Sequence, residues 1–462
     1  MYEQMQYKLK FDDIKASFNF KEDGGLIHRQ GIKIKILPYT ANDKEVVIDF
    51  RGVVGEFSRM ICNKELKEEV DLIRLIEDVT DEIGEFEGTS SKETFKDIIR
   101  SMFIDNDRLV DFNIKTINYI SSAKGDDKIS KFLFSIFFDD ELKQLVQEHY
   151  DRDVENILYK LVLNALPKLD ENVTNKENYK CYIPFIKDLF KRDFKFLIKN
   201  EELFKNSLKR LLEFYYMFYV SQLALKLSEF EKADLTKPDA IYYTLGWEST
   251  SKNRTAFKFG WDNVKNYVNS LFSHSITLEL LNHSGNEEQL GYKELYDLFC
   301  SGDESEIENE LDILFDMYTK QIKDKSWNDF KYKDRNSGNK GFDKVYKLFE
   351  AIEFQFVQTS RTGAKNKYNK RFTDFVEANF AKRRGALGYN LNLTEEDIIL
   401  FTKICINDNG KLKLSLLFDE FEKRGIFFDR DSKVKIVQLY EKLNLLEKKS
   451  DSGDAQYVRS IL

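Results

Sequence analysis

Apolar residues recur at three- and four-residue spacing through most of the chain. Between about residues 55 and 282 this spacing includes Leu72, Leu75 and Ile76. Residues 130–150, 154–166 and 185–230 show the same pattern, which is typical of amphipathic helices. Prolines, which break helices, number only four in the chain. The pattern predicts a mainly α fold with a large multi-helix body.

The N-terminal segment has a different period. Residues 31–37 alternate strictly between polar and apolar side chains, which favours a half-buried strand. Pro38 and residues 41–44 predict a turn, and residues 46–50 form a second apolar run. We therefore expect a small β-hairpin near the N-terminus.

The C-terminal stretch contains a series of short signals in a specific order. Thr394 is a hydroxyl N-cap that precedes three acids and an apolar helical run. The signals that follow are a turn at 407–410, a strand at 411–414, a helix capped by Ser415, a helix starting at Asp431-Ser432, and strands at 445–447 and 456–458 around a turn at 451–454. This order, helix, strand, helix, helix, hairpin, predicts a winged-helix domain.

The third helix of this domain is expected to bury Val434, Val437, Tyr440 and Leu443. Its other face would then carry Lys433, Lys435, Gln438 and Lys442, which suit DNA phosphates or bases. A winged helix can equally dock a protein, and Asp451 and Asp454 at the hairpin tip argue against close approach to phosphate. The sequence leaves DNA docking and protein docking open.

These changes of pattern divide the chain into four expected segments. They are an N-terminal β-containing segment (1–54), a helical body (55–325), a basic helical linker region (326–388) and the winged-helix domain (389–462). We expect partner proteins to bind the helical body, because of its size and its lack of recognisable chemistry.

Net charge, cysteine spacing and apolar runs limit the kinds of function that the chain can have. The chain has 462 residues, 33% of them charged, and a net charge of -8, so any contact with DNA must come from a local basic patch. The four cysteines form no closely spaced pair, which indicates a reducing compartment. The most apolar run, residues 211–220, is too short to span a membrane and predicts a buried core helix. With no apolar leader at its start, the protein is expected to be cytoplasmic and to have no membrane partner.

The densest basic patch lies between residues 361 and 384, where only Asp374 and Glu377 oppose the bases. It can follow a phosphate backbone, or bind an acidic partner or face solvent instead. Together with the third helix of the winged-helix domain it supplies the candidate DNA-binding residues: Arg361, Lys365, Lys367, Lys370, Arg371, Lys382, Arg383, Arg384, Lys433, Lys435, Gln438 and Lys442.

Catalytic motifs are lacking by contrast. Asp239 and Glu248 are the nearest approach to a nuclease metal pair, and no Glu-x-Lys in a credible strand accompanies them. There is no Gly-x-x-x-x-Gly-Lys-Ser/Thr phosphate loop, and the four histidines are scattered. We expect no catalytic residue, no metal and no cofactor.

Several stretches together resemble the DptG (DndG) family, the G component of DNA phosphorothioation-dependent restriction systems. They are His28 with residues 35–39, then 53–59, 247–254 with Gly260-Trp261, 280–282, 424–429 and 449–458. The resemblance spans nearly the whole chain, although none of these motifs is diagnostic of a mechanism.

The resemblance implies a role in bacterial antiviral defence. In such systems an assembly of F, G and H components damages DNA that lacks phosphorothioate, with F and H as the ATPase or helicase-like members. The implied function is a non-catalytic subunit that binds DNA and the F and H components. Two alternatives remain at this stage: a divergent DNA nuclease and a winged-helix transcription regulator.

Overall fold

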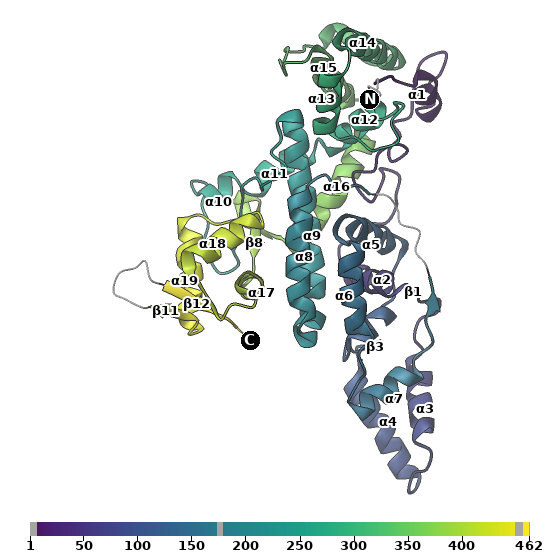
Figure 1. The fold of residues 1–462 in the computed structure, drawn as a ribbon, viewed down its shortest axis with the longest axis vertical. Helices are drawn as coiled ribbons and strands as arrows, with labels where there is room; N and C mark the ends of the chain where they lie inside the picture. The colour runs from purple at the N-terminus through teal and green to yellow at the C-terminus, as the bar shows by residue number, and fades with distance from the viewer. Residues whose placement is uncertain (1–6, 173–178, 449–455, 462) are drawn as a thin grey trace, which may run out of the picture. The chain divides into compact units, whose positions relative to one another are not determined.

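The computed structural model describes residues 7–172, 179–448 and 456–461. Within these ranges the chain forms 19 α-helices and a few small two- and three-stranded sheets, so the prediction of a mainly α fold is confirmed (Figure 1). Contacts divide the chain into two compact units: residues 1–48, 178–186 and 217–462 form unit 1, and residues 49–177 and 187–216 form unit 2. The units differ from the four expected consecutive segments because each is assembled from parts distant in sequence.

Unit 2 is helical and contains two short strand pairings. Its elements are α2 (Arg51–Cys62), β1 (Lys64–Glu65), α3 (Leu72–Ile83), α4 (Thr89–Phe103), β2 (Ile104–Asp105), β3 (Arg108–Leu109), η1 (Ile114–Tyr119), α5 (Lys124–Phe137), α6 (Asp140–Tyr150), α7 (Ile157–Ala165) and β4 (Asp170–Glu171). Strand β1 pairs with β4, and β2 pairs with β3, both antiparallel. Two helices, α8 (Pro184–Ile198) and α9 (Glu201–Glu229), contribute residues to both units.

Helix α2 is the centre of unit 2. Phe57 is fully buried and its ring contacts those of Phe134 and Phe138. Gly55 brings α2 close to the end of η1, because a Cβ at this position would lie 2.3 Å from the carbonyl oxygen of Ile120. Any larger residue at position 55 would therefore push these two elements apart.

Unit 1 contains the remaining elements. Before residue 394 they are α1 (Phe11–Ser17), η2 (Phe230–Lys232), β5 (Ile241–Tyr242), β6 (Thr244–Leu245), α10 (Thr255–Lys258), α11 (Trp261–Val268), α12 (Leu271–Leu281), α13 (Tyr292–Ser301), α14 (Glu304–Gln321), η3 (Trp327–Asp329), α15 (Lys340–Phe356), α16 (Thr362–Asn379), β7 (Ala381–Arg383), η4 (Gly385–Leu387) and β8 (Tyr389–Leu393). Every residue of α12 is buried, and α15 and α16 pack against it.

The region expected to be a basic linker is therefore part of the core. Helix α15 buries ten residues, among them Phe342 and Ile352, and α16 buries Tyr368, Phe372 and Phe375. Apolar residues at helical spacing between the lysines and arginines hold these helices in unit 1.

The predicted N-terminal hairpin is absent, because residues 31–37 and 46–50 form no strand. The backbone N–H groups of residues 31–34 all donate to the buried Glu279 carboxylate, at 2.8–3.4 Å. Farther along, the carbonyl of Glu45 accepts from Arg371 and that of Ile48 accepts from Asn379. Side chains of α12 and α16 thus form the hydrogen bonds with backbone N–H and carbonyl groups that a partner strand would otherwise have formed.

The C-terminal elements follow the expected order with one addition, strand β10 (Ile426–Phe427) between the second and third helices, which pairs in parallel with β5. They are α17 (Glu395–Ile406), β9 (Lys411–Lys413), α18 (Leu414–Lys423), β10 (Ile426–Phe427), α19 (Arg430–Lys442), β11 (Leu446–Lys448) and β12 (Gln456–Arg459). Strand β12 pairs antiparallel with both β11 and β9. Thr394 caps α17 as predicted, whereas the cap of α19 is Asp429, two residues earlier than expected. The predicted turn at 451–454, with Asp451 and Asp454, lies outside the described residues.

The predicted buried face of α19 was partly wrong, by a rotation of the helix. Tyr440 is buried as predicted and lies with the buried Ile436 and Leu439, whereas Val434 and Leu443 are 49% and 39% exposed. The polar cap at Asp429 starts the helix early, and Ser432 is the first residue turned inward. Two apolar side chains therefore remain on the outer face of α19 beside its lysines.

The apolar run at 211–220 is buried throughout and belongs to α9, as predicted. In the part of the chain that the structure describes, no helix has the length and apolar character that a membrane crossing requires.

Candidate functional site

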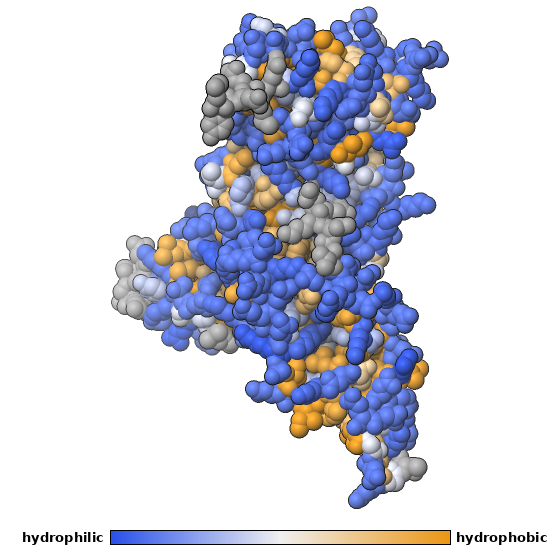
Figure 2. Space-filling model, turned by 45° about the vertical axis from the view of Figure 1, so that its right-hand side comes forward, coloured by the Kyte–Doolittle hydropathy of each residue, from blue (hydrophilic) through white to orange (hydrophobic). Residues whose placement is uncertain are grey.

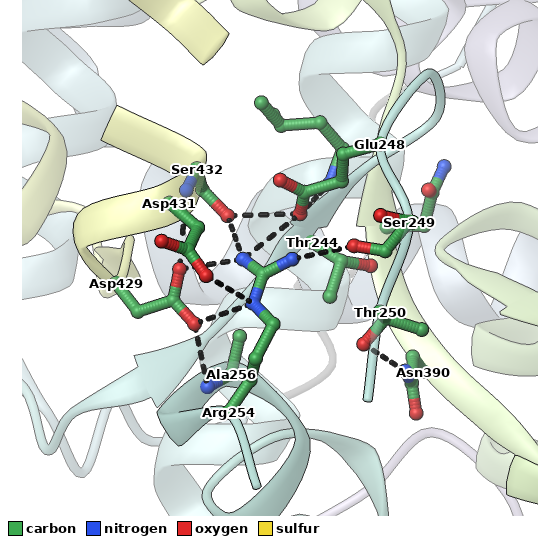
Figure 3. A network of polar contacts seen from close by, with 12 residues as sticks. Thr244, Glu248, Ser249, Thr250, Arg254, Ala256, Asn390, Asp429, Asp431 and Ser432 are labelled. Carbon is green, nitrogen blue, oxygen red and sulfur yellow. Dashed lines mark hydrogen bonds and ion pairs between the residues drawn. The ribbon is translucent and has the colours of Figure 1, made fainter. Parts of the chain in front are cut away.

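A polar network in unit 1 joins the segment after β6 to the start of α19. Its centre is Arg254, whose guanidinium forms two bonds with Asp429, Nε to Oδ2 at 3.0 Å and Nη2 to Oδ1 at 2.5 Å (Figure 3). Nη2 also donates to Ser432 Oγ at 2.7 Å, and Nη1 donates to the Ser249 carbonyl at 2.8 Å. This paired arrangement fixes the 249–254 segment to the N-terminus of α19.

Asp429 is both a helix cap and an ion-pair partner. Its carboxylate accepts from the backbone N–H of Ser432 at 3.1 Å and of Ala256 at 3.2 Å, in addition to Arg254. Burial alone would raise the pKa of this carboxyl, but the hydrogen bonds from Arg254, Ser432 and Ala256 lower the pKa overall. The carboxylate is thus held in its charged form at the positive end of α19.

Glu248 is the second acid in the network. Its side chain is 2% exposed, and Oε1 accepts from the Leu245 backbone N–H and from Ser432 Oγ, both at 2.9 Å. Arg254 Nη2 lies 3.2 Å from the same oxygen. One guanidinium therefore faces two buried carboxylates, Glu248 and Asp429.

The other side of this segment is held by β7 and β8. Strand β6 pairs in parallel with β8, and β7 pairs antiparallel with β8. Arg384 donates to the carbonyls of Glu248 at 3.0 Å and Leu245 at 2.8 Å, and Lys382 donates to the carbonyl of Gly246 at 2.7 Å. Two of the candidate DNA-binding residues thus bind the protein's own backbone.

Other candidates from residues 361–384 are also engaged within unit 1. Arg361 pairs with Asp324, Lys365 with Glu353, and Lys370 with Asp374. Arg371 is buried and donates to the carbonyl of Glu45. In the described ranges, Lys367 and Arg383 are exposed and form no ion pair.

The candidates on α19 lie closer to solvent. Lys433 pairs with Glu422 at 3.0 Å, and Lys435 Nζ donates to Gln438 at 3.2 Å. Lys442 is exposed and has no ion pair within the described part of the chain. A groove of about 610 Å³ follows this face; it is lined by Phe428, Arg430, Lys433, Val434, Val437, Gln438 and Glu441.

The network around Arg254 was not predicted as a site. Residues 247–254 carry part of the family resemblance, and Glu248 was expected at most to be a metal ligand. The one local signal was Asp429 three residues before Ser432, a capping spacing that would have placed the helix start at Asp429 but gives no sign of Arg254.

The nuclease candidates do not form a shared pocket of free carboxylates. Asp239 pairs with Lys226 at 2.8 Å, and Glu248 faces Arg254 and Ser432. Two histidines lie in aromatic surroundings: His28 contacts the Tyr318 hydroxyl and His274 the Tyr292 hydroxyl, and burial lowers the pKa of each to about 3. Within the described residues, no group of three or more His, Cys, Asp or Glu side chains is placed to hold a metal ion.

Comparison with known proteins adds no relative: no protein-family model matches the chain, and no curated protein matches it.

Proposed function

We propose that the protein is a non-catalytic, DNA- and partner-binding subunit of a bacterial phosphorothioation-dependent restriction complex, acting on DNA that lacks phosphorothioate. The observation that carries the proposal is the arrangement of residues 389–462. Their helix, strand, helix, helix, hairpin order and their β9–β12–β11 sheet support a winged-helix domain. The resemblance to the DptG (DndG) family supplies the assembly, with the F and H components as partners.

In a winged helix the third helix enters the DNA major groove and the hairpin lies on the backbone. Here the third helix is α19, and its exposed bases are Arg430 and Lys442, with Lys435 partly exposed. Lys448 on β11 adds a base to the hairpin, where it pairs with Glu441 at 2.9 Å. These cations can neutralise phosphates, whereas Gln438 is the side chain on this face that suits base edges.

The basic patch between residues 361 and 384 contributes less to the proposed DNA contact. Six of its eight candidates bind carboxylates or carbonyls of unit 1, so each contact with a phosphate would cost an existing interaction. Lys367 and Arg383 are the two that can contact phosphate without this cost. We therefore assign the main DNA contact to α19, where Arg430 and Lys442 are exposed and form no ion pair in the described ranges.

The test measures duplex binding by fluorescence anisotropy across a salt series. The variant Lys435→Glu/Lys442→Glu should weaken binding and flatten the slope of log affinity against log salt by about 0.9 for each phosphate that is no longer neutralised. The matched control is Lys8→Glu/Lys33→Glu, which reverses two exposed lysines of unit 1 that have no ion pair in the described ranges. An unchanged affinity and slope in the α19 variant would falsify the DNA-binding role of this helix.

The assembly role is tested by reconstitution. Unmodified plasmid should stay intact with this chain alone in Mg²⁺, and should be damaged by the F and H components only when this chain is added. Plasmid carrying phosphorothioate is the control. Nicking by the chain alone that disappears in Asp239→Asn would overturn the non-catalytic role.

A further inference from the structure

Three helices of unit 2 form a small group of their own. Helices α3, α4 and α7 pack around a core of eight buried residues, six of them from these helices, among them Ile76, Val79, Phe103 and Val162. The three helices lie together beyond α2, α5 and α6 (Figure 1). A core of this size leaves much of each helix uncovered.

The uncovered part is strongly apolar. Helix α7 is apolar along most of its length, yet only Val162 is buried. Ile73 at the start of α3 is 77% exposed and Ile157 at the start of α7 is 74% exposed. Ile98 and Met102, one helical turn apart on α4, are each 44% exposed. Figure 2 shows hydrophobic surface gathered over this part of the chain. Exposed apolar surface of this kind marks a site of protein interaction.

An acidic cavity adjoins the start of α3. It has a volume of about 530 Å³, and Val70 and Leu72 form part of its wall. Five carboxylates line it, against two arginines, Arg51 and Arg108; the acids are Asp49, Glu69, Asp107, Asp111 and Asp126. Glu69 and Asp107 are exposed and form no ion pair within the described residues.

Asp111 is the partly buried acid of this cavity that has only a distant cation as its partner. Its nearest paired cation is Arg51, at 3.8 Å, and its side chain is 30% exposed. Burial raises the pKa of Asp111, and the more distant charges of Arg51 and Lys205 only partly oppose this. A further cation beside the carboxylate would stabilise its charged form.

We propose that this surface, the α3–α7 face (Ile73, Ile157 and the cavity acids Glu69, Asp107 and Asp111), docks a partner protein through a segment that carries apolar side chains flanked by lysines or arginines. The inference rests on the proposed function, since it assigns the partner-binding role to one surface. Apolar side chains cover the isoleucines, and the basic groups meet the cavity carboxylates.

The negative charge of the cavity favours a basic partner segment over two other possible occupants. A second copy of the chain in a symmetric dimer would bring the same acidic surface against itself, and like charges repel. An anionic membrane would meet the same repulsion. A basic, amphipathic segment of a different protein satisfies both the apolar and the acidic parts of the face.

The test compares binding of the F and H components to full-length variants. Ile73→Asp/Ile157→Asp places acids in the first turns of α3 and α7, where acids suit the helix, so folding should be retained. We expect at least a tenfold loss of binding to one component. The matched control is Val357→Asp, which changes a 54% exposed residue of unit 1 and should bind normally.

The outcomes separate the two proposals. If the wild-type chain binds neither component, the proposed function fails. If the wild-type chain binds and Ile73→Asp/Ile157→Asp binds within twofold of it, the α3–α7 face is overturned and the proposed function stands. A wild-type chain that dimerises in sedimentation, and a variant that does not, would assign the face to a second copy and also overturn the inference.

A second variant tests the chemistry of the partner. Glu69→Lys/Asp107→Lys keeps the isoleucines and reverses two cavity charges, so it should weaken binding to the same component at low salt and reduce the salt dependence of binding. Binding that is unchanged, or stronger, would show that the partner segment is not basic.

Discussion

Two sets of basic residues in unit 1 lie in opposite surroundings. The inward arginines, Arg254, Arg371 and Arg384, are bound to carboxylates and carbonyls of the chain itself. The outward bases of α19, Arg430, Lys435 and Lys442, lie at or near the surface. Both sets look alike in sequence, as lysine and arginine among polar residues. The comparison teaches that a basic stretch predicts a binding surface only where its charges are not already used for folding.

The largest expected effect on stability comes from replacing Arg254, one of the inward arginines. Arg254→Met removes the guanidinium that faces Glu248 and Asp429, whose side chains are 2% and 10% exposed. Leaving buried carboxylates without their partner should lower the free energy of unfolding by about 3–5 kcal/mol. Urea unfolding measures the change.

The control for this variant is Arg383→Met, at an exposed residue, which should change stability by less than about 0.5 kcal/mol. Adding Asp429→Asn to Arg254→Met should recover part of the stability, because one unpaired charge is removed. A decrease below about 1 kcal/mol in Arg254→Met would break the distinction between inward and outward bases.

An intermediate effect is expected at Arg384. Its bonds go to the carbonyls of Leu245 and Glu248, so Arg384→Met should cost about 1–3 kcal/mol through unsatisfied acceptors. At temperatures where the variant is folded, its DNA affinity and salt slope should match those of the wild type. If Arg384→Met flattened the slope of log DNA affinity against log salt and left the stability unchanged, Arg384 would belong with the outward bases.

The smallest effect concerns pH. The folded-state pKa of Asp429 lies below its ordinary value of 3.8, so the folded protein binds this proton less tightly than the unfolded chain does. The contribution of the carboxylate to stability is therefore complete above about pH 4 and is lost as the pH falls through the folded-state pKa. The stability difference between the wild type and Asp429→Asn should be constant from about pH 5 to 7 and shrink below about pH 4. A difference that instead grows on acidification would contradict the assigned charge state.

The sequence predicted the C-terminal element order because each element carries its own local signals. Thr394 with Asp397 marks a helix start, and residues 411–413 alternate as a short strand should. The rotation of α19 was missed because Asp429 takes its second partner, Arg254, from 175 residues away. The pairing of Lys382 and Arg384 is equally non-local, since their acceptors lie 136 to 139 residues earlier.

The strict alternation of residues 31–37 was misleading for the same reason. Ile34 and Ile36 are buried, as a half-buried strand would require, but the backbone beside them is satisfied by side chains of later elements. Periodicity reports which side chains are buried. It does not report which groups accept the backbone hydrogen bonds, and these decide whether a strand forms.

The Glu279 carboxylate, which accepts hydrogen bonds from the backbone N–H groups of residues 31–34, also affects when this part of the chain can fold during synthesis. It follows them by 245–248 residues, which at ordinary rates of translation corresponds to a delay of roughly 12–50 s. During that interval the alternating segment has left the ribosome before its acceptor exists. A sequence of this pattern can pair with strands of neighbouring nascent chains. Completion of the N-terminal part of unit 1 therefore has to wait until residue 279 has been translated, although its own residues are among the first to be made.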